Sequence, residues 1–390
     1  MIKSGLHIIP IALCLIASGM TSCTTHNEES DSQKVFKVTG DYDKELADRM
    51  EVSFLKFQSP DSVVFKASAT TLKGNEGIYV LYDYSSNKFL IFDSTGEYRG
   101  GFSKRGQGPE EYGAMLSFAV GNDKIYVLDF TKIQVYDMNG NNLQTIPADG
   151  ERGQLAVDNS GNIYIQHGFH KEYQLTVMHP DGTVAARKFP SEEVVRGFEI
   201  PSSPENTLPA TGAGVFIAPP LGQTIYQIND TTQTEIATFD FGVDNIPGDF
   251  FNGTTGQVEN KFHNRRDHNN GFIYMDYLFV SDGWIVFLPV GLHRSEGRQI
   301  IFADRANGKT YTDNAIPKAL MLCLNNRPYF DGYDSSTGAF MRLVSGDALA
   351  TALETMDPED KEKIIAANPQ LLDFDEENDD FLLMLRLKNQ

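Results

Sequence analysis

The sequence predicts an all-β protein built as a six-bladed β-propeller, with a short helical segment near the C-terminus and an N-terminal signal segment. Short runs of β-branched and aromatic residues alternate with turns rich in Gly, Asn and Asp along most of the 390 residues. These units recur about every 40–45 residues, which is the length of a four-stranded propeller blade. Such a sheet has two apolar faces, and only neighbouring blades in a closed ring bury both.

The repeat is marked by one dipeptide and by one kind of turn. Ile-Tyr recurs at positions 78–79, 125–126, 163–164, 225–226 and 273–274. Gly96, Gly140 and Gly182 lie in turns of the first three units and are 44 and 42 residues apart. The spacing predicts blades at about 61–108, 114–148, 152–190, 197–242, 271–313 and 319–345, the last completed by a chain end.

Closing the ring requires a strand from outside the blade series. Two isolated apolar segments qualify, Val52–Gln58 and Phe381–Leu387, and both lie where a shared closing blade requires them. Acidic residues precede the second segment, and they would keep an unpaired strand soluble until it docks.

Two other segments lack the strand pattern and favour helices. Asp347 and the pair Asp357-Pro358 are helix-start signals in a stretch rich in Ala and Leu, so we expect a helical insert at about 346–368. Val243–Asn270 is a long polar insertion, in which we expect a helix around Val258–Arg266.

The first 22 residues have the composition of a secretory signal. Lys3 supplies the positive charge, and Ile8–Ala17 is an apolar stretch too short to span a bilayer. The following Met20-Thr21-Ser22-Cys23 resembles a bacterial lipoprotein lipobox, with Met where Leu is usual. This resemblance implies cleavage before Cys23 and lipidation of its thiol. An ordinary secretory signal with an incidental cysteine is the alternative.

These features divide the chain into a signal peptide at 1–22, a flexible tether at 23–45 and a propeller domain at 46–390. The acidic residues after the lipobox resemble the surface-export signal of Bacteroides-type lipoproteins. We therefore expect a cell-envelope protein that is lipid-anchored to the outer membrane, facing either the periplasm or the cell surface. Removal of the signal leaves two cysteines, the lipidated Cys23 and Cys323. We therefore expect no disulfide framework, and we expect the thiol of Cys323 to be buried.

The net charge of −20 and the sequence pI near 4.8 argue against two classes of partner. Nucleic acid needs a basic surface, and anionic lipid headgroups would be repelled. We expect a monomer that contacts the membrane through the lipid on Cys23, with a glycan, a peptide or an envelope protein as its partner.

The most specific motif is Lys104–Tyr112, which reads KRGQGPEEY after a strand pair reading FDSTGEYRGGF. It is similar to the pattern K-R-G-x-G-P-G-E-Y of the six-bladed β-propeller lipoproteins of Bacteroides-type bacteria, which are related in architecture to NHL-repeat and TolB-like propellers. Glu110 stands where Gly is usual. The resemblance implies a lipid-anchored six-bladed propeller and no settled activity.

The same loop is a candidate ligand contact. It is expected to cross from the outer strand of the first blade to the inner strand of the second, and it offers Arg105, Gln107 and Tyr112 for hydrogen bonds and stacking. The alternative is structural: the glycines permit the crossing, Pro109 stiffens it, and Tyr112 packs between blades.

A basic cluster in the polar insertion is the second candidate. It contains His263, Arg265, Arg266 and His268, and Arg provides a planar fork for carboxylates. The alternative is a solvated helix or loop face. A pair of His residues without a nearby Cys is a weak metal signal, and no calcium-loop pattern is present, so we name no metal site.

The sequence contains no nucleophile elbow, Walker A or dinucleotide motif, so we assign no catalytic residue and no cofactor. We expect a binding or scaffold module. The alternative is an envelope hydrolase or lyase at the mouth of the propeller channel. That alternative requires ionisable side chains from several blades, such as His263, Arg265 and Asp129, to converge in one pocket.

Overall fold

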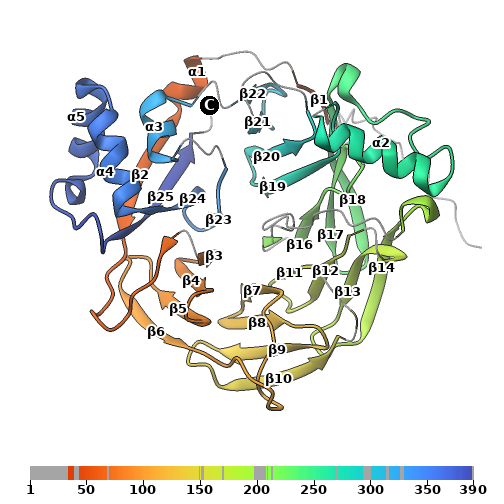
Figure 1. Ribbon diagram of the computed structural model, residues 1–390, viewed down its shortest axis with the longest axis horizontal. Coiled ribbons are helices and arrows are strands. Elements are labelled where there is room, and N and C mark those ends of the chain that lie inside the picture. Colours follow the sequence, from red (N-terminus) through yellow and green to blue (C-terminus); the bar gives the residue numbers. More distant parts are fainter. Residues whose placement is uncertain are drawn as a thin grey trace, which may run out of the picture. The chain divides into compact units, whose positions relative to one another are not determined.

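The computed structural model describes residues 34–38, 44–67, 70–148, 150, 153–168, 171–196, 208, 210–211, 214–268, 270–292, 300–312, 316–325 and 329–388. They all lie in one compact unit, Gln33–Gln390. Within it, six β-sheets are arranged in a ring (Figure 1). The predicted six-bladed propeller is therefore confirmed. The expected signal peptide, including Cys23, lies outside the described residues.

Each blade is a sheet of four antiparallel strands, which run in order from the innermost to the outermost. Blade one contains β3 (Thr70–Asn75), β4 (Ile78–Asp83), β5 (Lys88–Phe92) and β6 (Tyr98–Phe102). Blade two contains β7 (Ser117–Gly121), β8 (Lys124–Leu128), β9 (Lys132–Asp137) and β10 (Asn142–Pro147). Blade three contains β11 (Gln154–Val157), β12 (Ile163–Gln166), β13 (Tyr173–Met178) and β14 (Val184–Pro190).

The other three blades follow the same plan, and two of them include strands from the N-terminal part of the chain. Blade four contains β15 (Ala210–Thr211), β16 (Gly214–Ile217), β17 (Thr224–Asn229) and β18 (Thr232–Asp240), with β1 (Lys34–Lys37) as a fifth strand. Blade five contains β19 (Tyr274–Val280), β20 (Trp284–Val290), β21 (Ile301–Asp304) and β22 (Thr310–Thr312). Blade six contains β23 (Gly332–Asp334), β24 (Ala339–Ser345), β25 (Asp380–Leu387) and β2 (Met50–Lys56).

The antiparallel order gives the ring two distinct ends. The turns between the first and second strands of the blades lie at one end, which we call the first-turn end. The turns between second and third strands lie at the other end, together with the crossings from one blade to the next. We call this the crossing end.

Segments from far apart in the sequence close the ring. β2 pairs antiparallel with β25 over seven residue pairs, from Met50 opposite Leu387 to Lys56 opposite Phe381. Both predicted closing segments are therefore used, and they pair with each other. Blade six takes its outer strand from the N-terminal part of the chain and its third strand from the C-terminal part.

Part of the expected tether is structured instead. β1 pairs in parallel with β18, and the ring of Phe36 stacks on that of Phe239 with centroids 5.1 Å apart. Phe36 is 1% exposed, so the burial of this ring favours docking over free motion. The expectation of a tether through residue 45 is therefore wrong for Lys34–Lys37, and a short helix α1 (Lys44–Asp48) follows.

Helices also occupy other connections between the described strands. α4 (Gly346–Thr355) and α5 (Pro358–Ala367) confirm the helical insert, and α2 (Thr255–Asp267) confirms the helix of the polar insertion. α3 (Lys318–Cys323) lies where the sequence predicts the start of the sixth blade. Its Ala, Leu and Met residues are strong helix formers, which explains the difference. Short 3-10 turns occur at Glu193–Val195, Gly242–Asp244 and Pro369–Leu371.

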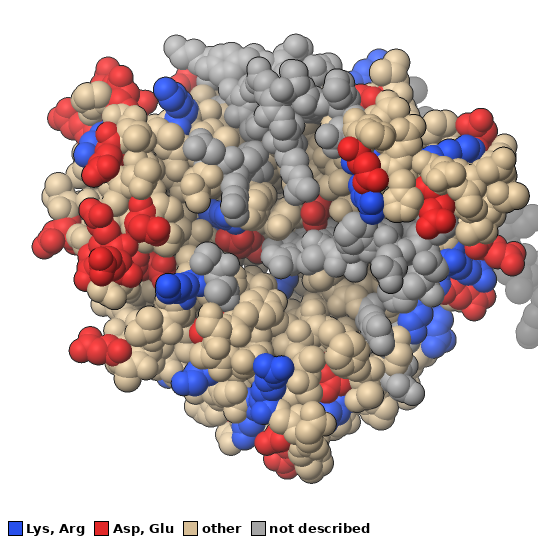
Figure 2. All heavy atoms as spheres, in the orientation of Figure 1, with Lys and Arg blue, Asp and Glu red and all other residues tan. Residues whose placement is uncertain are grey.

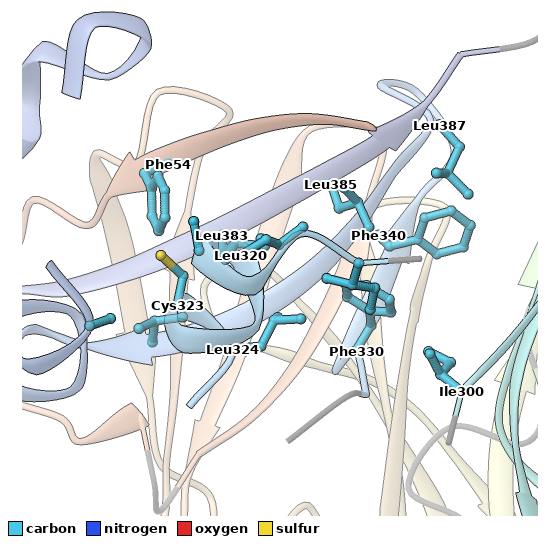
Figure 3. Packing of buried hydrophobic residues seen from close by; sticks show 14 of the residues in the cluster. Phe54, Ile300, Leu320, Cys323, Leu324, Phe330, Phe340, Leu383, Leu385 and Leu387 are labelled. Atoms are coloured by element: carbon cyan, nitrogen blue, oxygen red, sulfur yellow. The ribbon is translucent and has the colours of Figure 1, made fainter. Parts of the chain in front are cut away.

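The core consists of apolar clusters between neighbouring blades and beneath the helices. The largest joins blades five and six to α3 and α4, where Leu320 and Cys323 pack with Phe54 and Leu383 (Figure 3). Cys323 is fully buried, as expected, and burial raises the pKa of its thiol to about 12.

Among the described residues, no helix is long and apolar enough to cross a membrane.

Candidate functional site

The crossing loop between blades one and two is held closed by its own backbone. The Gly106 N–H donates to the Tyr112 carbonyl, and the Tyr112 N–H donates to the Lys104 carbonyl, both at 3.0 Å. The Glu111 carboxylate accepts the Gly108 N–H at 2.8 Å. A Cβ on Gly106 would overlap this carboxylate, so a larger residue there would displace it from the Gly108 N–H. The loop's own carboxylate thus occupies the position in which an anionic ligand would meet the Gly108 amide, and the Gly106 amide is bonded to the Tyr112 carbonyl.

Blade two fixes the other side of the loop. The Tyr136 hydroxyl donates to the Glu110 carbonyl at 2.7 Å, and the Gln134 amide donates to the Pro109 carbonyl at 2.8 Å. Tyr112 is 0% exposed, and its ring lies 6.1 Å from that of Phe89 and 6.4 Å from that of Tyr136. Burial raises the pKa of Tyr112 above its ordinary value. Tyr112 therefore contributes to packing between blades one and two.

Arg105 and Gln107 remain on the surface at the crossing end. Arg105 Nη1 donates to Asn87 Oδ1 at 2.7 Å, and the Tyr82 hydroxyl donates to the same oxygen at 3.2 Å. The ring of Tyr82 in turn contacts that of Tyr84 at 5.0 Å. A continuous series of contacts therefore links the guanidinium to an aromatic side chain that is 49% exposed.

Blade two presents a second exposed aromatic at the equivalent turn. Phe130 is 45% exposed and directly follows a buried Asp129, just as Tyr84 follows a buried Asp83. Asp83 accepts the Ser85 N–H at 2.9 Å, and Asp129 accepts the Thr131 N–H at 2.8 Å. Each aspartate fixes its turn, so the aromatic side chain is exposed from a defined position. We call Tyr84, Arg105, Gln107 and Phe130 the crossing-end patch.

The basic cluster lies on and just after α2, in the connection between blades four and five (Figure 1). The guanidinium of Arg265 donates to the carbonyls of Asp244, Asn245 and Phe272, at 2.6, 2.9 and 3.2 Å. It thus ties the helix to its own connection. Desolvation lowers the pKa of Arg265, and Asp244 partly offsets this.

The other members of the cluster lie beside acidic residues. His263 is 3.8 Å from Glu259 and 3.9 Å from Asp267, and Arg266 contacts Asp267 at 2.6 Å. His268 caps the helix, where its N–H donates to the Asn264 carbonyl at 3.2 Å. The cluster is therefore largely neutralised on its own helix.

The innermost strands line a partly open cavity of about 110 Å³ at the first-turn end of the channel. Its lining comes from the final residues of β3, β7, β11, β19 and β23 and from the first turns, with Leu208 and Ala210 contributed from blade four. None of the seven ligand-contact residues expected from the sequence lines this cavity. Those residues lie on crossing connections, at the opposite end of the blades.

Sequence reasoning missed the cavity because its lining comes from all six blades. One signal was present: small residues occur in the innermost strands, where a propeller ring is narrowest. They include Ala119 and Gly121 in β7 and Ala156 in β11. Without the register of each blade, these residues could not be distinguished from ordinary turn and core positions.

Comparison with known proteins identifies the family. Residues 50–385 match the model of a domain of unknown function, DUF4934. The chain belongs to the DUF4934 family. No curated protein matches it.

One solved structure supports the propeller fold of the DUF4934 chain. A putative exported protein from Bacteroides fragilis is similar with a TM-score of 0.68 at 19% identity, covering 92% of this chain and 100% of that one. A member of the DUF4221 family from Bacteroides vulgatus has a TM-score of 0.48 at 10% identity, covering 88% and 100%. At 19% identity, the similarity to the Bacteroides fragilis protein concerns the fold alone.

A hydrolase or lyase site would need the expected ionisable side chains to meet in one pocket. In the DUF4934 chain they do not. Asp129 accepts the Gly113 N–H at 3.2 Å within blade two, whereas the contacts of His263 and Arg265 lie on α2 and its connection. The three side chains therefore belong to separate networks. Among the described residues, no group of three or more His, Cys, Asp or Glu is placed to hold a metal ion.

One further polar cluster of the DUF4934 chain lies in blade six. The guanidinium of Arg342 is 3.9 Å from the ring centroid of Tyr329 and pairs with Asp331 at 2.7 Å. Tyr329 stacks on Tyr277 at 4.6 Å, where β19 bulges and Tyr277 has a φ of 47°. Asp331 also accepts the Leu343 N–H at 2.7 Å, so this ion pair fixes the start of blade six.

Proposed function

We propose that this protein is a lipid-anchored binding or scaffold module of the cell envelope, and that its crossing-end patch holds a glycan, peptide or protein partner. The repeated geometry of Tyr84 and Phe130 carries the proposal. Neighbouring blades each expose an aromatic side chain directly after a buried aspartate. Exposed aromatic and Arg side chains are typical anchors in binding surfaces.

The rigidity of the patch supports this function. Asp83 and Asp129 fix the two turns, and the crossing loop that carries Arg105 and Gln107 is bonded to blade two. A surface that is ordered before binding loses little conformational entropy when a partner docks. The patch is therefore suited to recognition.

Two observations support an envelope location. The motif Met20-Thr21-Ser22-Cys23 resembles a lipobox. The similar structure from Bacteroides fragilis is described as a putative exported protein. We propose export followed by lipidation of Cys23, with the outer membrane as the anchoring site.

Binding is tested with the full chain on glycan and peptide arrays and by affinity capture with identified partners. We expect a ligand whose binding falls about tenfold or more in the double variant Tyr84→Ala/Phe130→Ala. The control is Val64→Ala/Leu143→Ala, which removes two side chains that are 73% and 52% exposed but lie outside the patch. No ligand on any platform, combined with turnover of a substrate, would reject the binding function.

Anchoring is tested with Cys23→Ala in the producing cell. We expect loss of metabolic labelling by radioactive palmitate and release of the protein from the membrane fraction. If the variant remains in the membrane fraction and keeps its label, the lipid anchor on Cys23 is wrong. Export without labelling in the unaltered protein would indicate an ordinary secretory signal.

A further inference from the structure

We propose that the channel cavity at the first-turn end is a second binding site, and that it takes a single neutral sugar ring. This site is independent of the crossing-end patch, since it lies at the opposite end of the blades and shares no residue with it. The origin of the cavity, its size and the groups that line it all support this assignment.

The glycine at position 121 in the cavity lining is not explained by backbone conformation or by lack of space. Gly121 ends β7 with an ordinary backbone conformation, and a Cβ there would lie in normal contact with Val157, at 3.6 Å. A larger residue is therefore compatible with the backbone, and the missing side chain leaves space in the channel. Gly74 and Gly332 have a different explanation, because Cβ atoms on them would approach the end of Met341 in β24, at 2.7 and 2.9 Å.

The volume limits the ligand to one small ring. A water position requires roughly 10–15 Å³ on this scale, so about 110 Å³ corresponds to several waters. One sugar ring replaces a cluster of that size, with its hydroxyls near the sites of the displaced waters. A longer chain could place only its terminal ring inside.

The polar lining matches hydroxyl groups. Asn75, Asn159 and Ser335 surround the space with groups that both donate and accept hydrogen bonds, as sugar hydroxyls also do. Lys73 and Glu76 add one positive and one negative charge. Because these charges balance, the lining favours a neutral polyol over an anion or a cation.

An aromatic side chain provides a surface for the apolar face of the ring. Tyr333 of β23 is partly buried and lines the cavity, with Phe279 of β19 also in the lining. Burial raises the pKa of Tyr333, and its hydroxyl, like any neutral phenol at pH 7, can donate a hydrogen bond. The C–H face of a pyranose packs well on such rings.

The proposal is tested by saturation-transfer NMR and titration of the full chain. The probes are glucose, galactose, mannose and N-acetylglucosamine, with glycine, serine and glutamate as the competing class. We expect at least one sugar to bind with a Kd of about 1 mM or tighter and the amino acids to bind at least tenfold more weakly. No sugar with a Kd below roughly 10 mM, or preferential binding of an amino acid, would overturn the proposal.

Variants locate the binding. Gly121→Leu fills the cavity and should weaken sugar binding about tenfold or more. Its matched control is Gly256→Leu on α2, where a Cβ meets no atom within 4 Å, and binding there should be unchanged. If Gly121→Leu misfolds, Asn159→Ala provides the test, since it removes one amide from an exposed turn and should weaken binding severalfold.

Two outcomes separate this site from the crossing-end patch. Tyr84→Ala/Phe130→Ala should leave sugar binding unchanged, even if it abolishes partner binding. Sugar binding that survives both Gly121→Leu and Asn159→Ala in folded protein would place the sugar elsewhere and refute the cavity site.

Discussion

Aspartate side chains repeatedly fix the turns of this propeller at the level of single residues. Asp137 accepts the N–H groups of Asn139 and Asn141, both at 2.8 Å, and Asp158 accepts those of Ser160 and Asn162, both at 2.9 Å. The turn glycines then adopt positive φ, as at Gly140 with 81°. Because these contacts are local, the turn pattern was readable in the sequence.

The crossing loop permits a matched glycine comparison. Gly106→Ala would force a Cβ into the Glu111 carboxylate, whereas Gly113→Ala would place one 3.7 Å from the Gln107 amide. We expect Gly106→Ala to destabilise the protein by about 1–3 kcal/mol and Gly113→Ala to be nearly neutral. Thermal unfolding measures both. Equal melting temperatures for the two variants would contradict the role assigned to Glu111.

A second residue-scale prediction concerns pH. Burial raises the pKa of Asp380 to about 7, with a further contribution from the carboxylates of Asp347 and Asp379, while a hydrogen bond from the Ala67 backbone opposes them. Between about pH 4 and 7, the folded state therefore binds a proton that the unfolded state has released, and stability at this site falls as pH rises through this range.

Asp380→Asn removes this titration while keeping the shape of the side chain. We expect the variant to melt at a higher temperature than the unaltered protein at pH 8 and to keep only a smaller advantage at pH 5, where less of the cost of ionising Asp380 has built up. Differential scanning calorimetry at the two pH values measures the effect. A benefit at pH 5 as large as that at pH 8 would exclude deprotonation of Asp380 as its cause.

At the scale of elements, β1 connects the N-terminal part of the chain to two blades. It pairs with β18 of blade four, and the Thr310 hydroxyl of blade five donates to the Lys37 carbonyl at 2.7 Å. Arg49, just before β2, then pairs with Asp304 of blade five at 3.0 Å. One short segment therefore contacts blades four and five before it completes blade six.

This docking should depend on one aromatic side chain. Phe36→Ala removes a ring that is 1% exposed. If β1 stays docked, we expect the free energy of unfolding to fall by about 3–5 kcal/mol. If it does not, β1 is released from β18. Val35→Ala is the control, because Val35 is 59% exposed on the same strand. Hydrogen exchange of the β18 amides distinguishes the two variants. Unchanged protection of β18 in Phe36→Ala would show that β1 adds no stability there.

The sequence predicts an element correctly where the element depends on local contacts. The prediction fails where the element depends on residues far away in the chain. The Ile-Tyr dipeptide falls on second strands in β4, β8 and β12, on a third strand in β17, and at the start of a first strand in β19. The repeat thus gave the number of blades without the register of each. The parallel pairing of β1 and the cavity depend on chain segments brought together only by the ring.

The whole molecule has an uneven charge distribution. Exposed acidic residues gather over α4, α5 and the following turn (Figure 2). They include Glu354, Asp357, Glu359, Glu362, Asp373, Asp375, Glu376 and Glu377. This surface contributes to the net charge of −20 and would be repelled by anionic surfaces. The crossing-end patch instead carries the positive charge of Arg105.

The packing of the β2–β25 pair, which closes the ring, can be tested directly. Leu385 of β25 is 0% exposed between β2 and β24, whereas the neighbouring Arg386 is exposed. We expect Leu385→Ser to lower the stability by about 3–5 kcal/mol and to increase the hydrodynamic radius, with little effect from Arg386→Ser. Urea unfolding and size-exclusion chromatography measure this. Similar behaviour of the two variants would mean that the β2–β25 seam does not hold the ring together.

The seam also sets the order of events when the chain is made. Residues 50–56 pair with residues 381–387, so the sixth blade cannot form until residues 381–387 have been synthesised. Five blades can assemble their own sheets during synthesis, but the early strand β2 must wait unpaired for its partner. Any factor that delays the final segment prolongs the lifetime of an open ring, whose unpaired edges invite association between chains.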